Sequence, residues 1–287
     1  IKMFLILIFT IKQIIKITFM KFKILLLLLV FSKLIAQQNN SVVKIQYSET
    51  IQYIPTTVNN YTGTLLVQNE YSYYVSDYIN TDKATKNEDE EDVIVVNTPE
   101  FKFNGEVFTN TKTKELTENL YENKFLKKSF SVTEALPKIK WTLLKGEKKF
   151  NNFICKKAKA TFRGRTYNVW YTEKIPVSAG PWKLNGLPGL ILSAEDTDGI
   201  YKWEVKNIKY PYTEKGLNLK DTYSKRIKYK KVAFKEFDEM VVKAIKNKIK
   251  MISARNSNRD GIKVGFGYNT LQDREPTNEW RTQTDFN

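Results

Sequence analysis

The chain has 287 residues, of which 41% are hydrophobic and 13% aromatic, and its formal net charge at pH 7 is +16. A chain of this length and apolar content can fill a core, so we expect one folded domain and not a disordered chain. It contains no histidine, which excludes Ser-His-Asp and Cys-His catalysis and histidine-based zinc or copper sites.

The first 36 residues are typical of a targeting sequence. Met20 to Lys23 form a short basic region, Ile24 to Phe31 are an unbroken apolar run, and Ser32 to Ala36 supply a cleavage region. The run is too short to span a bilayer core, which favours a signal peptide over the alternative of a transmembrane anchor. We therefore expect a signal peptide within 1–36, preceded by a spurious N-terminal extension before Met20, and no transmembrane span in the mature chain.

Cys155 is the only cysteine, so no internal disulfide is expected, and the usual lipoprotein anchor is missing after the apolar run. We expect an exported protein, periplasmic or secreted, that is not lipid-anchored. Removing the six lysines of the first 36 residues leaves 16 − 6 = +10 for the mature chain. This charge favours anionic partners such as lipid headgroups, although a solvated basic surface explains it more simply. Export argues against nucleic acid.

From Val42 onward the sequence predicts β-strands. Val43, Ile45 and Tyr47 alternate with polar residues, as in a strand with one buried face. Further strands are expected at Thr64–Gln68, Tyr71–Tyr78, Glu106–Asn110 and Lys128–Val132. The acidic stretch at 81–92 is expected to be a loop, and its consecutive carboxylates cannot all converge on a metal ion.

The strongest pattern predicts a hairpin between 156 and 171. Ala158, Ala160 and Phe162 share one face of the first strand, and Arg163 and Gly164 form the turn. The return strand carries the alternating aromatic and aliphatic residues Tyr167, Val169 and Tyr171.

Two short motifs follow the hairpin, Gly180-Pro181-Trp182 and Gly186-Leu187-Pro188-Gly189-Leu190-Ile191. Pro188 and Gly189 suit the two central positions of a type II turn, because the second position requires a positive φ. A buried strand is expected at 190–194, a turn at 196–199 and another strand around Tyr201 and Trp203.

A helix is predicted from Phe234 to Arg255. Its apolar residues fall on one stripe, and acidic residues precede basic ones, as the helix dipole favours. We expect this stripe to pack on the sheet, although a membrane surface is the alternative. The polar segment 256–287 is expected to be a flexible tail.

Few residues suggest chemistry. Glu195, Asp196 and Asp198 could form a carboxylate pair for hydrolysis or bind calcium, but a turn before Gly199 explains them more simply. Cys155 is expected to be a packed structural residue. Glu173 and Glu195 are a weak candidate pair for glycan hydrolysis. Aromatic and basic side chains that could contact a ligand, although a core role explains the aromatics more simply, are Arg163, Arg165, Tyr167, Trp170 and Tyr171.

The two motifs, together with Cys155-Lys156-Lys157-Ala158, Phe162-Arg163-Gly164-Arg165 and Trp170-Tyr171-Thr172, closely resemble the GLPGLI family, exported proteins of the Bacteroidetes group. The resemblance is strongest over Trp141–Pro211 and weaker upstream to Val42, and the two ends of the chain depart from it. It implies export, but no activity, cofactor or catalytic residue.

We therefore expect a mainly β (α+β) domain at 37–255, with a curved antiparallel sheet or half-barrel and one long C-terminal helix. The leading hypothesis is a non-catalytic envelope module, without cofactor or metal, that binds an apolar or amphiphilic ligand such as a lipid in the concave face. Finding that face filled by its own side chains, with no cavity, would overturn this hypothesis. The second hypothesis is an interaction module that pairs a sheet edge or the hexapeptide loop with an outer-membrane protein. A glycan hydrolase comes third.

Overall fold

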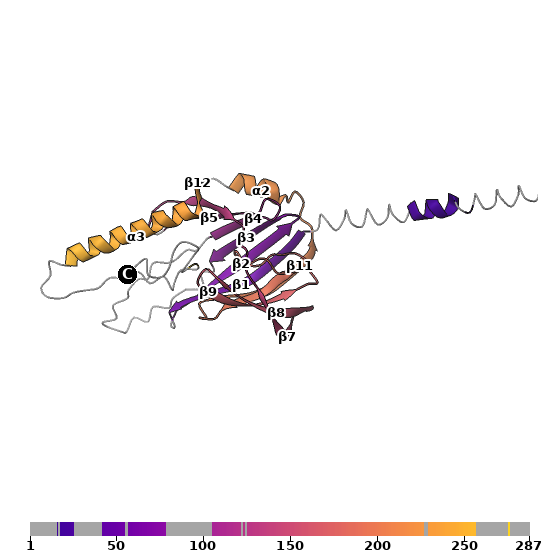
Figure 1. The fold of residues 1–287 in the computed structure, drawn as a ribbon, viewed down its shortest axis with the longest axis horizontal. Helices are drawn as coiled ribbons and strands as arrows, with labels where there is room; N and C mark the ends of the chain where they lie inside the picture. Colours follow the sequence, from indigo (N-terminus) through magenta and orange to yellow (C-terminus); the bar gives the residue numbers. More distant parts are fainter. Residues whose placement is uncertain are drawn as a thin grey trace, which may run out of the picture.

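One twelve-stranded sheet forms the body of the protein, with helices beside it (Figure 1). The computed structural model describes residues 16, 18–25, 42–54, 57–78, 105–121, 123, 125–226, 229–256 and 275. The strands are β1 (Val42–Ile54), β2 (Thr57–Gln68), β3 (Tyr71–Tyr78), β4 (Gly105–Asn110), β5 (Glu115–Leu120), β6 (Phe130–Ala135), β7 (Thr142–Phe150), β8 (Phe153–Phe162), β9 (Arg165–Thr172), β10 (Leu190–Asp196), β11 (Tyr201–Tyr212) and β12 (Lys230–Ala233). The helices α2 (Leu219–Arg226) and α3 (Phe234–Asn256) flank β12 in sequence.

The sheet consists of two antiparallel meanders that share β1. From β1 one meander runs outward through β2 to β6, and β7 to β11 return from the opposite end until β11 pairs with β1. The short β12 pairs with β6 in parallel and closes the first end, while β7 forms the other. The segment 136–141 therefore connects one end of the sheet to the other.

A contact between distant strands shows that the sheet is strongly curved. Arg163, in the turn between β8 and β9, donates from Nη1 to Glu134 Oε1 of β6 at 3.2 Å. Eight strand steps separate β6 from β9, which amounts to roughly 38 Å in a flat sheet. The two halves therefore approach each other across the inner side. The expected mainly β fold with a curved sheet is confirmed.

The main core lies on the inner side of this curve. Alternate residues of β1 and β11 point into it, among them Ile45, Tyr47 and Trp203, which are fully buried. Tyr47 donates its hydroxyl to Ile191 O at 2.7 Å, and burial raises the pKa of this phenol. Aromatic rings and aliphatic strand residues thus fill the space that curvature encloses.

The predicted hairpin is present as β8 and β9. Arg163 and Gly164 have φ values of +47° and +86°, as the two-residue type I′ turn requires. Cys155 is completely buried in β8, and burial raises the pKa of its thiol to about 11. A protonated, enclosed thiol is a structural residue, as expected.

The predicted C-terminal helix is present as α3, but it docks less than expected. Phe234 and Phe237 are buried against Phe130, Val132 and Val232 of β6 and β12, whereas the helix extends beyond the sheet (Figure 1) and Met251 is 59% exposed. The eight-residue α2 was not predicted, so α3 is not the only helix in this half of the chain.

Several predictions concern residues outside the described ranges. Residues 16 and 18–25 are helical, while the predicted cleavage region, the acidic stretch 81–92 and all of 257–287 except Glu275 are not described. No helix within the described ranges combines the length and apolar character needed to cross a membrane.

Candidate functional site

The hexapeptide forms a loop that inserts into the inner side of the sheet. Gly186 has a φ of +97°, a conformation that glycine adopts at little cost, and its N–H donates to Ser178 Oγ at 2.9 Å. Leu187 is 2% exposed and belongs to the main core, whereas Pro188 faces solvent. Leu190 and Ile191 begin β10 and are fully buried.

The role of Gly189 differs from the prediction. Its φ lies outside the left-handed region, so the type II turn predicted for Pro188 and Gly189 is wrong. A Cβ on Gly189 would lie 2.2 Å from Thr172 O and 2.7 Å from Thr172 C. Glycine is required here because the loop passes directly against the backbone at the end of β9.

The Gly180-Pro181-Trp182 motif anchors the same loop. A Cβ on Gly180 would lie 2.9 Å from the Ile191 side chain and from Leu184 O. Trp182 has a φ of +53°, which is rare for a bulky residue. Its ring stacks on Trp203 with a centroid distance of 6.5 Å and an interplanar angle of 6°. This rarely adopted backbone conformation thus places the indole ring of Trp182 in the main core, on the inner side of the curved sheet.

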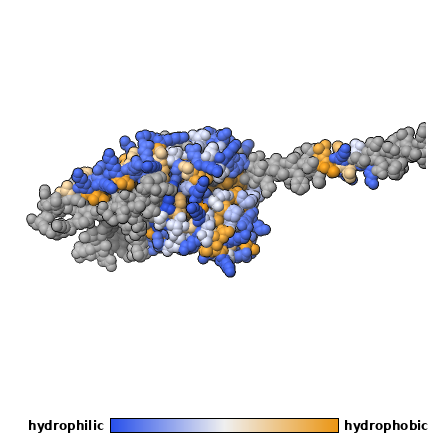
Figure 2. Space-filling model, viewed as in Figure 1, coloured by the Kyte–Doolittle hydropathy of each residue, from blue (hydrophilic) through white to orange (hydrophobic). Residues whose placement is uncertain are grey.

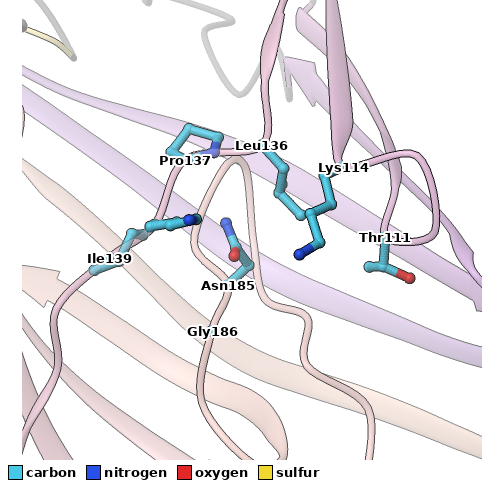
Figure 3. A pocket seen from close by; sticks show the side chains of 8 residues that line it. Thr111, Lys114, Leu136, Pro137, Ile139, Asn185 and Gly186 are labelled. Carbon is cyan, nitrogen blue, oxygen red and sulfur yellow. The ribbon is translucent and has the colours of Figure 1, made fainter.

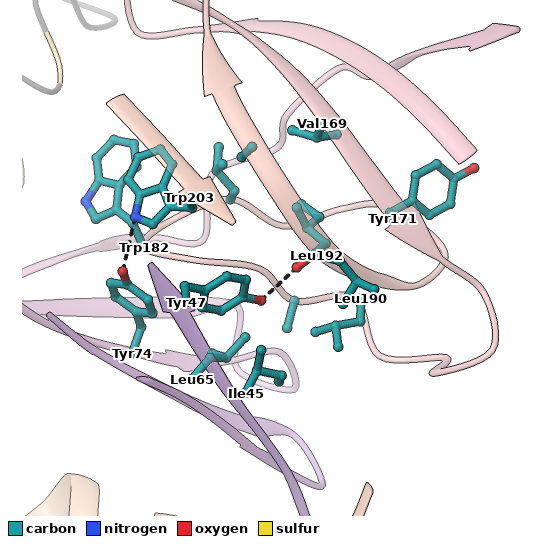
Figure 4. Close-up of a cluster of buried hydrophobic side chains, with 14 of the residues drawn as sticks. Ile45, Tyr47, Leu65, Tyr74, Val169, Tyr171, Trp182, Leu190, Leu192 and Trp203 are labelled. Atoms are coloured by element: carbon teal, nitrogen blue, oxygen red, sulfur yellow. Dashed lines mark hydrogen bonds between the residues drawn. The ribbon is translucent and has the colours of Figure 1, made fainter. Parts of the chain in front are cut away.

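The inner side of the sheet is filled around this loop. Figure 4 shows Trp182 and Trp203 packed beside Tyr74 and Tyr47, and Trp203 Nε1 donates to Tyr74 Oη at 3.1 Å. Trp182, Trp203 and their neighbours are 4% exposed or less. In the described part of the chain, these side chains occupy the space that was expected to hold a ligand, so the prediction of a ligand site in the concave face is wrong.

Next to Trp182, five ionisable residues form a buried charge cluster: Glu118, Glu134, Arg163, Lys183 and Glu275. The Lys183 side chain is fully buried, and its Nζ lies 2.9 Å from Glu118, 3.0 Å from Glu134 and 3.0 Å from Glu275. Arg163 pairs with Glu134 and Glu275. The cluster joins β5, β6, the β8–β9 turn and the segment 180–189 between β9 and β10, which contains both motifs up to the start of β10 and is called the motif loop below. It therefore bridges the two halves of the sheet.

Lys183 stays protonated in the cluster although its side chain is fully buried. Burial opposes the protonated form of Lys183, but three carboxylates raise its pKa overall. The ring of Phe234, the first residue of α3, lies 4.4 Å from Arg163 Cζ and 4.9 Å from Lys183 Nζ, which adds cation–π attraction. The charge cluster was not predicted from the sequence. The one local indication of it is that Lys183 lies between two hydrophobic residues, Trp182 and Leu184, which are both buried.

The carboxyl of Glu275 makes the stability of the fold sensitive to acid. Burial opposes its ionisation, but the charges of Lys183 and Arg163 hold its pKa below the usual value of 4.5. Such a carboxyl stabilises the folded state above pH 4.5, and this stabilisation is lost as the pH falls through the folded-state pKa. We expect Glu275→Gln to lower the free energy of unfolding at pH 7 and to make its decline below pH 4.5 shallower.

Urea unfolding measured between pH 3 and 7 tests this expectation. Glu236→Gln, at an exposed position in the first turn of α3, is the matched control. Parallel pH profiles for the wild type and Glu275→Gln would contradict a role for this carboxyl.

At the rim of the sheet, the hexapeptide loop borders an open cleft of about 310 Å³ (Figure 3). Its apolar wall comes from the connecting segment 136–141, and the turn between β4 and β5 forms another side. Lys114 extends from that turn toward Asn185 (Figure 3). The lining residues are Thr111, Lys114, Leu136, Pro137, Lys138, Ile139, Asn185 and Gly186. We refer to this site as the rim cleft.

Hydrogen bonds fix the walls of the rim cleft. Trp141 Nε1 donates to Asn185 O at 2.8 Å, which ties the connecting segment to the motif loop. Leu136 N donates to Lys114 O at 2.8 Å, which ties the same segment to the β4–β5 turn. The cleft is thus formed by three segments that are already joined to one another.

The ligand contacts predicted from sequence lie mostly inside the protein. Arg165 is 1% exposed and pairs with Asp196 at 2.8 Å, while Tyr167 and Tyr171 are buried in the main core. Arg163 belongs to the charge cluster. Trp170 is half-buried, with Lys157 Nζ 5.7 Å from its ring centroid. None of these five residues lines the rim cleft, so their role in ligand binding stays a prediction.

The geometry does not support the carboxylate pair proposed for hydrolysis. Glu195 is opposite Asn168 in the pairing of β10 with β9, and Glu173 lies five residues further along the chain. This offset corresponds to roughly 16 Å along the strand, more than glycosidase carboxylates require. Asp196 instead accepts hydrogen bonds from Arg165 and from Tyr201 N. Among the described residues, no group of three or more His, Cys, Asp or Glu side chains is placed to hold a metal ion.

Residues 163–193 match the model of a family described as Porph_ging, protein of unknown function. The matched segment begins at the β8–β9 turn and contains both motifs of the loop. No curated protein matches the chain.

Two solved crystal forms of the protein PNGF-II resemble this chain, with 18% and 17% identity and TM-scores of 0.47 and 0.48. The alignments cover 71% of this chain but 34% and 33% of PNGF-II, so the chain spans about a third of that protein. A LolA superfamily protein from Nitrosomonas europaea has 9% identity and a TM-score of 0.27, over 61% of this chain and 88% of that one. All three TM-scores lie below 0.5. These similarities therefore add nothing to the description of the fold, which is defined by the strand order of this chain.

Proposed function

We propose that this protein is a non-catalytic module of the cell envelope that binds a small anionic amphiphile in the rim cleft. The lining of the cleft carries the proposal. Leu136, Pro137 and Ile139 offer an apolar wall, and Lys114 and Lys138 add two cations at its border. An apolar surface with a few polar groups that fix orientation is the usual composition of a small-molecule site.

The size of the cleft limits the ligand. A volume of about 310 Å³ is at the lower end of the range for ligand pockets. It suits an anionic headgroup with part of one chain, and not a complete lipid. This proposal keeps the ligand class expected from the sequence, but moves the site from the filled inner side to the rim.

The walls of the cleft are held before any ligand arrives. Asn110 Oδ1 accepts from Lys112 N at 3.0 Å and from Thr113 N at 3.1 Å, which stabilises the turn that carries Lys114. Little ordering is therefore needed on binding, which favours affinity. Export of the protein remains part of the proposal and is supported by the pattern of the first 36 residues. Membership of the GLPGLI family is also proposed, on the two motifs of the loop.

Binding of lysophosphatidylglycerol, measured by native mass spectrometry and calorimetry, tests the proposal. We expect Lys114→Glu/Lys138→Glu to weaken binding by roughly tenfold or more, because both charges at the cleft are reversed. Both lysines are exposed, so the thermal midpoint should stay within about 2 °C.

Lys112→Glu/Lys140→Glu is the matched control. These lysines are exposed and lie in the same turn and the same connecting segment, but do not line the cleft. Equal weakening by both double variants would reduce the effect to general charge attraction. Absence of binding to the wild type would overturn the proposal.

A further inference from the structure

Strand β7 is an exposed edge of the sheet. Within the described ranges it pairs with β8 alone and ends the strand order. Every residue from Thr142 to Lys149 is exposed, so among the described residues no element buries either face of the strand. An edge of this kind presents a row of backbone N–H and C=O groups that another strand can pair with.

Three large apolar side chains of the β7–β8 hairpin are exposed, on both faces and at both ends of it. Leu143 is 63% exposed, Leu144 37%, and Ile154 of the adjacent β8 58%. Figure 2 shows apolar and charged surface side by side at the lower end of the body, where Figure 1 places β7 and β8. The opposite edge differs: β12 has four residues and continues directly into α3.

The β7–β8 hairpin is also strongly basic. Between 142 and 162 it carries six lysines and one acidic residue, Glu147, so its formal charge is 6 − 1 = +5. The lysines are Lys145, Lys148, Lys149, Lys156, Lys157 and Lys159. Lys156 pairs with exposed Glu173 at 2.7 Å; this contact is worth little in solvent.

These properties favour one kind of partner. The lysines of β7 disfavour a second copy of the same edge, because two copies of β7 would bring six lysines against two glutamates. A lipid phase would leave the edge backbone without hydrogen-bond partners. An acidic peptide strand supplies both opposite charge and backbone partners, and its alternate side chains can cover the exposed leucines.

We propose that β7 is a docking edge for an extended acidic segment of another protein, which adds to the sheet as a further strand. The site is distinct from the rim cleft and does not depend on the ligand proposed there. Charge attraction brings the segment to the hairpin, and backbone pairing with β7 holds it.

Fluorescence anisotropy with a labelled decapeptide of alternating Glu and Val tests this docking edge. A decapeptide of alternating Glu and Pro has the same charge but lacks the N–H donors of the proline positions. We expect the first peptide to bind and the second to bind at least tenfold more weakly. Amide exchange at 142–150 should slow when the first peptide is bound.

Lys148→Glu/Lys149→Glu should weaken binding of the Glu-Val peptide by roughly tenfold or more. Lys230→Glu/Lys231→Glu, with the same charge change at two exposed positions of the opposite edge, should leave it unchanged. Equal affinity for both peptides, or equal losses in both variants, would overturn the proposal in favour of diffuse attraction. Failure to bind the peptide while binding phosphatidylglycerol vesicles would overturn it in favour of a membrane surface.

Discussion

Lys183→Met is expected to lower the free energy of unfolding by about 3–5 kcal/mol, because it removes the fully buried cation from the charge cluster. Glu134 and Glu275 would keep Arg163 as a partner, whereas Glu118 would lose the cation with which it pairs. Methionine occupies a similar volume, so the loss reflects unpaired buried charge rather than a cavity. The loss should appear as a lower midpoint of urea unfolding with little change in slope.

A double-mutant cycle separates charge from packing at this position. Glu118→Gln removes the carboxylate that lies 2.9 Å from Lys183 Nζ. In the Lys183→Met background it should restore part of the lost stability, because one unpaired charge is removed. Exposed Lys174→Met should change stability by less than about 0.5 kcal/mol. A Lys183→Met protein as stable as the wild type would contradict the importance of the cluster.

Gly189→Ala is expected to destabilise the protein by about 3 kcal/mol or more, or to prevent folding. Its Cβ would lie 2.2 Å from Thr172 O, and the backbone contact can only be relieved by moving the motif loop away from the end of β9. That movement would disturb Leu187 and Leu190, which are buried in the main core. Thermal unfolding and the soluble yield measure the effect.

Gly199→Ala is the control that separates steric contact from backbone conformation. Gly199 has a φ of +71°, and a Cβ there would have nothing within 4 Å, so only the left-handed conformation is penalised. Its expected cost is about 1–2 kcal/mol. If Gly189→Ala were no more harmful than Gly199→Ala, close approach to Thr172 would not be the reason for glycine in the hexapeptide.

Local patterns were sufficient to predict the elements with one buried face. Alternation in Val43, Ile45 and Tyr47 predicted β1, and the Arg163-Gly164 turn predicted the β8–β9 hairpin. The apolar stripe predicted α3. The strand β5 was missed because its sequence, Glu115–Leu120, contains polar residues such as Glu118 and Asn119. Partners from elsewhere in the chain compensate for the burial of these residues: Lys183 pairs with Glu118, and Ser131 donates a hydrogen bond to Asn119.

The candidate sites depend on contacts that no local pattern reports. Glu118, Glu134, Arg163, Lys183 and Glu275 are far apart in sequence, and they meet because the sheet curls. The rim cleft forms where the connecting segment passes the hexapeptide loop. Neither site contains a residue type or spacing that indicates binding by itself.

The sequence by itself determined the β-rich class, the hairpin, the C-terminal helix and the position of an unusual motif at 186–191, because period-two and helical patterns record which side of an element is buried. Only the tertiary structure decided that Gly189 serves close approach, that β7 lies at an edge and that the motif loop fills the concave side. Strand order and curvature arise from pairing between distant segments, and such pairing leaves no periodic trace in the residues that it joins.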